Sequence, residues 1–294
     1  MTSNETAWST GIDRAAHEQN RLSWNAVTDA HNSHKRDQAG FLRAGGSTLF
    51  PDEIALAGNV TGQRLLHLQC NCGQDTLSFA QRGAVVTGVD ISDEAIAFAR
   101  QLAADAGIPG EFVRSDIYDW LADAAARGDQ FDIVFASYGV MIWLSDLTAW
   151  ANGIASVLKP GGRFVLVEFH PMLTSLEADW TVAYPAIGGQ MSRFSEGIGD
   201  YVGFVDGLLS PSGHEEGVRD FENPHPTVEF AWSVGEIVTA LLEAGLTLRQ
   251  LREYPYSNGF APFKGFQPLA GNRYTMPADR PAIPMMFGIV AGKP

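Results

Sequence analysis

The stretch LLHLQCNCGQDT (65–76) decides the fold of this chain. A short apolar run leads into a turn that contains a single glycine, Gly73, and a helical pattern follows the turn. This order of strand, turn and helix is the start of a βαβ unit. The turn after such a strand lies where open parallel sheets bind ligands. The segment is therefore either a ligand-binding loop or, because it carries two cysteines and a histidine, a metal site.

The metal interpretation is limited by the number of ligands. Cys70 and Cys72 are the two cysteines of the 294-residue chain, and with His67 they supply three ligands, whereas a structural zinc site takes four. In a strand their side chains face away from that of His67. We therefore expect no bound metal, with the cysteines as small, partly buried residues in a reducing compartment. His67 is either a hydrogen-bonded core histidine or a ligand contact.

The composition limits the kinds of molecule that this protein is expected to bind. The formal net charge of −14 argues against a nucleic-acid-binding protein, because such binding depends on Lys and Arg displacing counterions from phosphates, and it also disfavours anionic membrane surfaces. No apolar stretch approaches the roughly 20 residues that span a bilayer, and residues 1–14 show no signal-peptide pattern. We expect a cytoplasmic protein with a small-molecule substrate, no nucleic-acid partner and no membrane partner. The oligomeric state stays open.

Strand and helix patterns alternate over the middle of the chain, which is typical of a parallel sheet. The candidate strands are residues 64–69, 84–90, 111–114, 131–137 and 163–169. Two further runs, 247–253 and 285–291, are expected to pair at one sheet edge. The fold class expected is α/β: a Rossmann-like, doubly wound, mostly parallel seven-stranded sheet with an antiparallel edge strand.

Two acidic residues follow strands at positions suited to a nucleotide-type ligand. Asp90 ends the second candidate strand, 17 residues after Gly73, where an acid can accept hydrogen bonds from ribose hydroxyls. Asp116 follows the third strand and would lie beside it. Either residue could instead cap the helix that follows it, because short acids are common before helices.

Five segments in this order resemble the class I S-adenosylmethionine (SAM)-dependent methyltransferases that act on small molecules. They are LLHLQCNCG (65–73), GVDIS (88–92), RSDI (114–117), FDIVFASYGV (131–140) and LKPGGRFVLVEF (158–169). The first motif of the family usually holds an acid and three glycines. Here His67 replaces the acid, Gln69 and Asn71 replace two glycines, and Gly73 remains.

The resemblance implies a set of cofactor-binding residues and a division of the chain. Gln69, Asn71 and Gly73 would line the methionyl and ribose end of SAM, Asp90 and Ile91 the ribose and adenine face, Asp116 and Ile117 the adenine, and Ser137 the floor near the sulfonium. The expected parts are an N-terminal helical lid (1–60), a SAM-binding Rossmann-like core (61–170), a substrate cap insertion (171–228) and a C-terminal completion of the sheet (229–294).

The implied activity is methyl transfer from SAM to a small molecule, at oxygen or nitrogen in preference to carbon, by in-line displacement. Side chains at the carboxyl ends of the fourth and fifth strands would face the methyl group, which nominates Tyr138, Glu168 and His170. His170 is the candidate base, since an imidazole titrates near neutral pH, and its rival role is to seat the turn at Pro171. Two other classes remain: a nicotinamide-dependent oxidoreductase, although its G-x-G-x-x-G signature is missing from 71–76, and a non-catalytic SAM-binding protein.

Overall fold

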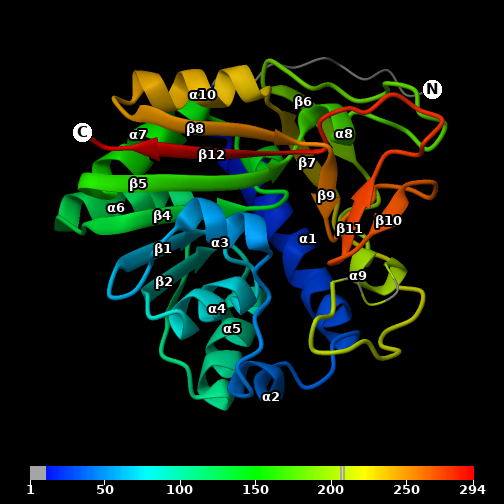
Figure 1. Ribbon diagram of the computed structural model, residues 1–294, viewed down its shortest axis with the longest axis horizontal. Helices are drawn as coiled ribbons and strands as arrows, with labels where there is room; N and C mark the ends of the chain where they lie inside the picture. Colours follow the sequence, from blue (N-terminus) through cyan, green and yellow to red (C-terminus); the bar gives the residue numbers. More distant parts are fainter. Residues whose placement is uncertain (1–10, 206, 208) are drawn as a thin grey trace.

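The computed structural model describes residues 11–205, 207 and 209–294, so the first ten residues of the expected lid lie outside the described residues. A central sheet of seven strands has helices on both faces and smaller elements gathered at one end (Figure 1). Its strands are β1 (Arg64–Leu68), β2 (Val85–Asp90), β3 (Glu111–Arg114), β4 (Phe131–Ser137), β5 (Leu158–Phe169), β8 (Thr247–Tyr254) and β12 (Met286–Gly292).

The strand order is β3-β2-β1-β4-β5-β12-β8, and the pairs from β3 to β5 are parallel. All seven expected strands are present, which confirms the fold class. The antiparallel strand is β12, one position in from the edge, because it pairs antiparallel with both β5 and β8. The chain leaves one strand position open between β5 and β8. Strand β12, at the end of the chain, fills this position in the antiparallel direction.

The helices begin where the sequence places capping residues. They are α1 (Arg14–Ser33), α2 (Gln38–Arg43), α3 (Pro51–Ala57), α4 (Gln74–Gln81), α5 (Asp93–Ala106), α6 (Ile117–Arg127), α7 (Leu147–Val157), α8 (Pro171–Thr174), α9 (Tyr201–Phe204), α10 (Val234–Glu243) and the short 3-10 helix η1 (Met141–Trp143). Ser92 and Asp146 cap α5 and α7, and Ser233 forms a capping box with Glu236. Each side chain accepts a hydrogen bond from a backbone N–H that the first turn leaves unpaired.

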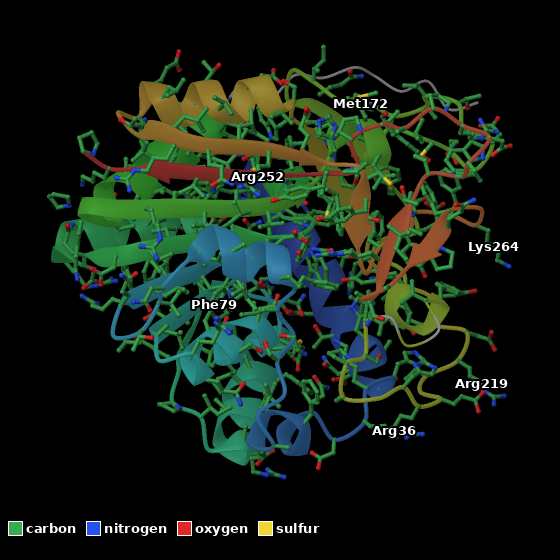
Figure 2. The ribbon with its side chains drawn as sticks, in the orientation of Figure 1. Arg36, Phe79, Met172, Arg219, Arg252 and Lys264 are labelled. Atoms are coloured by element: carbon green, nitrogen blue, oxygen red, sulfur yellow. The ribbon has the colours of Figure 1, made fainter. Side chains whose placement is uncertain are left out.

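Side chains on the two sheet faces build two apolar layers. Phe164 and Leu166 of β5 pack with α6, α7 and α10, whereas Val165 and Val167 pack toward α3 and α4. This alternation follows from the two-residue period of a strand. Phe79 of α4 lies inside the second layer, while Arg36, Arg219 and Lys264 lie at the periphery (Figure 2).

The remaining elements gather at the carboxyl ends of the parallel strands. Helix α1 runs past these ends and contacts α9 and β7, and two small sheets lie at the same end of the molecule (Figure 1). One small sheet pairs β6 (Gln190–Phe194) with β7 (Thr227–Ala231), and the other joins β9 (Tyr256–Asn258), β10 (Gln267–Leu269) and β11 (Arg273–Thr275). Within the described ranges, no helix is both long enough and apolar enough to cross a membrane.

Candidate functional site

A cavity of about 1200 Å³ opens at the carboxyl ends of β1, β2 and β4, where the strand order reverses. Its walls come from three parts of the chain: the loops of the core, the helix α1 with the residues after it, and the segment that carries β6 and β7. His17, Trp24 and His31 contribute to the wall at a helical spacing of seven, so they form one stripe along α1. We call this space the central cavity.

Most residues expected to bind the cofactor line the central cavity. They are Gln69, Asn71, Asp90, Ile91, Asp116, Ile117 and Ser137. Gly73 is absent from the wall, and its place in the packing explains why: a Cβ there would come within 2.6 Å of the Phe112 ring. Gly73 therefore allows close packing between the loop and β3.

The loop after β1 has positive φ angles, which glycine usually adopts, at two positions that carry side chains. Gln69 and Asn71 have φ angles of +53° and +47°, which place both in the left-handed region, and Gly73 has a φ of +75°. A left-handed conformation costs a side-chain-bearing residue roughly 1 to 2 kcal/mol. The Asn71 side chain offsets part of this cost, because its Oδ1 accepts a hydrogen bond from the Cys72 N–H at 2.7 Å.

Asp90 supports the loop as well as lining the cavity. Its two carboxylate oxygens accept hydrogen bonds from the backbone N–H groups of Asn71 at 2.8 Å and Ser92 at 2.9 Å. Ser92, not Asp90, is the N-cap residue of α5. Burial raises the pKa of the Asp90 carboxyl, and the backbone hydrogen bonds act in the opposite direction. Each oxygen keeps a second lone pair for a ligand hydroxyl.

Asp116 has the helix-capping role that the sequence left open. Its Oδ1 accepts from the Tyr118 N–H at 2.9 Å at the start of α6. Its Oδ2 lies 2.7 Å from both His17 Nδ1 and Arg14 of α1. Burial alone would raise the pKa of this carboxyl, but His17 and Arg14 hold it below its usual value. Asp116 thereby ties α1 to the core at the cavity wall.

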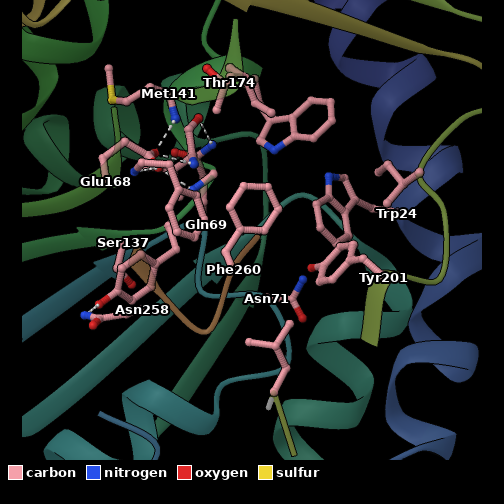
Figure 3. Close-up of a pocket in the computed structure, with 18 of the residues that line it drawn as sticks. Trp24, Gln69, Asn71, Ser137, Met141, Glu168, Thr174, Tyr201, Asn258 and Phe260 are labelled. Carbon is pink, nitrogen blue, oxygen red and sulfur yellow. Dashed lines mark hydrogen bonds between the residues drawn. The ribbon is translucent and has the colours of Figure 1, made fainter. Parts of the chain in front are cut away.

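Glu168 and Tyr138 shape the end of β4. The buried carboxylate of Glu168 accepts four backbone hydrogen bonds, from Gly139, Val140, Met141 and Phe169, at 2.5 to 3.1 Å (Figure 3). The loop after β4 is therefore held by one side chain. Tyr138 lines the cavity with a φ of +49°, and its hydroxyl accepts from Asn258 Nδ2 at 2.8 Å. Burial, reinforced by Glu53, raises the pKa of Tyr138 well above its usual value, so its hydroxyl stays protonated and can donate.

His170 lies at the turn before Pro171, where a structural role is the alternative to that of a base. It is not among the residues that line the central cavity, and its Nδ1 accepts the N–H of Met172 at 3.1 Å as the N-cap of α8. Its Nε2 lies 3.2 Å from Glu253, and its ring meets Phe287 edge-on. Both ring nitrogens are engaged, so this position favours a structural role at the Pro171 turn over that of a base.

The histidine and cysteines of the loop are buried, and His67 and Cys70 also contribute to the cavity wall. His67 Nδ1 pairs with Thr76 Oγ1 at 2.8 Å, and burial lowers the pKa of His67 to about 3. Burial also raises the pKa values of both Cys70 and Cys72. No group of three or more potential metal ligands occurs in the described part of the chain.

Two cavity residues were not singled out from the sequence. Lys35 lines the cavity, and none of the described residues forms a hydrogen bond or ion pair with its ammonium group. Burial lowers the pKa of Lys35, opposed by Cys72 and Asp75. Glu229 of β7 also lines the cavity. Lys35 belongs to the expected N-terminal lid (1–60), whereas nothing in the local sequence pattern around Glu229 marks that residue.

Comparison with known proteins places the core in a family. Residues 65–162 match the family described as methyltransferase domain. Two solved structures share the fold: SAM-dependent methyltransferases from Mesorhizobium loti (TM-score 0.51, 21% identity, 85% of this chain and 99% of that chain) and, as a putative enzyme, from Listeria monocytogenes (TM-score 0.53, 17% identity, 87% and 99%). Residues 65–162 therefore match a methyltransferase domain, and the chain has the fold of SAM-dependent methyltransferases.

Curated relatives match part of their length. A SAM-dependent Diels-Alderase from Talaromyces variabilis is 34% identical over 52% of this chain and 53% of its own length. A ubiquinone biosynthesis O-methyltransferase from Aeromonas salmonicida (strain A449) is 30% identical over 36% of this chain and 43% of its own length. The chain thus spans about half the length of the curated relatives it matches.

Proposed function

We propose that this protein transfers a methyl group from SAM to a small molecule, at oxygen or nitrogen in preference to carbon. The observation that carries the proposal is the continuous central cavity of about 1200 Å³, which joins the expected cofactor residues to the wall formed by β6 and β7. Small-molecule sites usually measure about 300 to 1,000 Å³. The space therefore suits two ligands, a donor and an acceptor, better than one.

The residues at one end of the cavity fit the amino-acid part of SAM. Lys35 and Asp75 both line the wall, and each influences the pKa of the other without forming an ion pair. The buried Oε1 of Gln69 has no partner in the described structure, because the amide donates from Nε2 to the Val140 carbonyl. We assign Lys35 to the carboxylate of the methionyl group, and Asp75 and Gln69 to its ammonium group.

The nucleoside part would lie along the ends of β2 and β3. Asp90 keeps lone pairs for ribose hydroxyls, and Ile91 and Ile117 supply apolar contacts for the adenine. His17 and Asp116 close this end from the side of α1. Residues 11–60, the described part of the expected lid, would thus hold the donor in place, while the segment 171–228 would cover the acceptor.

Bound SAM supplies an electrophilic methyl group on a sulfonium. The chain would contribute alignment and exclusion of water, because in-line displacement gains most from a fixed near-attack geometry. Aromatic side chains serve this purpose: Trp24 and Tyr201 lie on one side of the cavity, and Phe260 lies between them and the Glu168 loop (Figure 3). Ser137 and Tyr138 stand at the end of β4 with hydroxyl groups that can orient the acceptor.

Calorimetry tests the donor site directly. We expect SAM and S-adenosylhomocysteine to bind and NADH not to bind. Lys35→Ala should weaken binding of both sulfur compounds about 10-fold or more, because a charge-assisted hydrogen bond contributes roughly 1.5 to 3 kcal/mol. Arg36→Ala is the matched control, since Arg36 is the next residue and is exposed at the periphery (Figure 2). Absence of S-adenosylhomocysteine binding at millimolar concentration would refute the proposal.

The Diels-Alderase relative suggests a second candidate function. That relative is described as SAM-dependent, and the aromatic cavity here could hold an extended apolar substrate in a folded conformation. In such a role the methyl group would stay on the donor. Recovery of SAM unchanged after product formation would favour this candidate, whereas stoichiometric S-adenosylhomocysteine would favour methyl transfer.

A further inference from the structure

One face of the β6–β7 sheet forms a wall of the central cavity. Ser192 lies opposite Glu229, and Phe194 lies opposite Thr227, in the antiparallel register. Paired residues of antiparallel strands point to the same face, and alternate residues share a face. All four of these residues line the cavity, as does Ala231. Glu229 is therefore the one ionisable side chain that this face of the described sheet presents to the cavity.

The other face of β7 is packed against α1. Val228 and Phe230 are buried in a cluster with Ala16, and the backbone of Val228 exchanges two hydrogen bonds of 2.8 Å with the side chain of Asn20. This packing fixes the strand and its twist. Glu229 consequently projects into the cavity from a rigid support.

Glu229 is partly buried, and no described residue forms a hydrogen bond or ion pair with its carboxylate. The charge of Glu229 contributes to raising the pKa of Tyr184, but the Tyr184 hydroxyl already donates a hydrogen bond to Glu177. Arg193 of β6 falls on the opposite face of the sheet by its register. On α1, His17 is paired with Asp116, and η1 contributes no titratable residue. The Glu229 carboxylate is therefore free to accept a hydrogen bond from a ligand in the cavity.

The β6–β7 sheet lies next to the residues that follow β4. Strand β7 packs against η1, which follows the β4 loop, and Trp232 Nε1 donates to the Leu144 carbonyl at 2.7 Å. Ser137 at the end of β4 is the residue that the family resemblance places near the sulfonium. Glu229 and Ser137 therefore line the same cavity, one from the β6–β7 sheet and the other from the end of β4.

We propose that Glu229 is the general base that takes the proton of the acceptor, so that the acceptor is an aromatic molecule with a hydroxyl or amine group. This inference rests on the proposed methyltransferase function. The cavity walls on the Glu229 face include Phe194 and Tyr184, whose rings lie 5.9 Å apart and suit contact with an aromatic ring. A carboxylate acceptor would be repelled by Glu229 and would need no base.

The proposed step balances without a further reactant. The acceptor O–H or N–H bond breaks, and its proton moves to a Glu229 oxygen. The acceptor atom forms the bond to the methyl carbon, while the electron pair of the carbon–sulfur bond stays on the sulfur. Burial raises the pKa of Glu229 to about 7, so its carboxylate is a stronger base than an exposed glutamate and is still ionised near neutral pH.

Methyl transfer from methyl-labelled SAM tests this assignment with catechol, benzylamine and benzoate as probes. We expect methylation of catechol or benzylamine and none of benzoate. Glu229→Gln should lower kcat at least about 100-fold, the usual contribution of a general base. It should leave the SAM dissociation constant unchanged and remove the fall in kcat/KM below about pH 7. Glu222→Gln is the control, because Glu222 is exposed on the same segment.

A second measurement decides the matter if none of the probes is methylated. Carbon-13 NMR of glutamate-labelled protein with S-adenosylhomocysteine should show a carboxyl that titrates near pH 7 and is missing in Glu229→Gln. Titration at the ordinary value of about 4.3, or methylation of benzoate in preference to the other probes, would overturn the assignment. Failure of S-adenosylhomocysteine to bind would instead refute the proposed function itself, so the two failures are distinguishable.

Discussion

Replacement of Gly73 by alanine tests why one glycine of the first motif survives. The new Cβ would lie 2.6 and 2.8 Å from atoms of the Phe112 ring and 2.9 Å from the Ala99 Cβ. These contacts are too close, so the strand and α5 would have to shift, which costs typically 1 to 3 kcal/mol. The φ of +75° adds roughly 1 to 2 kcal/mol for a residue with a Cβ. We therefore expect Gly73→Ala to lower the free energy of unfolding by about 2 to 5 kcal/mol.

Gly107→Ala separates the two contributions. Gly107 has a φ of +67° at the end of α5, and no atom lies within 4 Å of the position its Cβ would take. This variant should lose only the backbone contribution, about 1 to 2 kcal/mol. Urea denaturation followed by circular dichroism gives both values, with equal m-values as a check on two-state behaviour. Equal losses in the two variants would refute the packing role of Gly73.

Two further predictions concern buried ionisable groups. Glu168→Gln should lower the free energy of unfolding by about 2 to 4 kcal/mol, because the amide NH₂ cannot accept from the N–H groups that now share the carboxylate; a loss below about 0.5 kcal/mol in urea denaturation would contradict this. The folded pKa values of His67 and His31 are lowered to about 3 and about 4, so stability is complete above their unfolded value of about 6.5 and falls as the pH drops toward the folded values. Each histidine should lower the free energy of unfolding by about 1.6 kcal/mol between pH 6.5 and 5, and His67→Gln should remove one of the two contributions in denaturation curves at the two pH values; an unchanged pH dependence in this variant would show that His67 is not the source.

The sequence predicts strands and helix boundaries because both depend on residues that are close together in the chain. The alternation of strand and helix patterns predicted the strands, and the helix caps Ser92, Asp146 and Ser233 act through hydrogen bonds within three residues along the chain. The fifth strand is longer than the expected 163–169: β5 begins at Leu158, because Leu158 pairs with Phe131 and Gly161 donates to the Lys293 carbonyl. The Gly161–Lys293 hydrogen bond joins residues more than a hundred positions apart in the chain.

The sequence by itself determined the order of the elements, the position of the loop after β1 and the two acids that follow β2 and β3, because each depends on residues near one another in the chain. Tertiary structure decided what those side chains do. Asp116 meets His17 across 99 residues, and His170 meets Glu253 across 83. Lys35 precedes the core (61–170) in the sequence and Glu229 follows it, yet both side chains line the central cavity. Hydrogen bonding and burial set the role of an ionisable group, and both depend on neighbours that only the folded chain brings together.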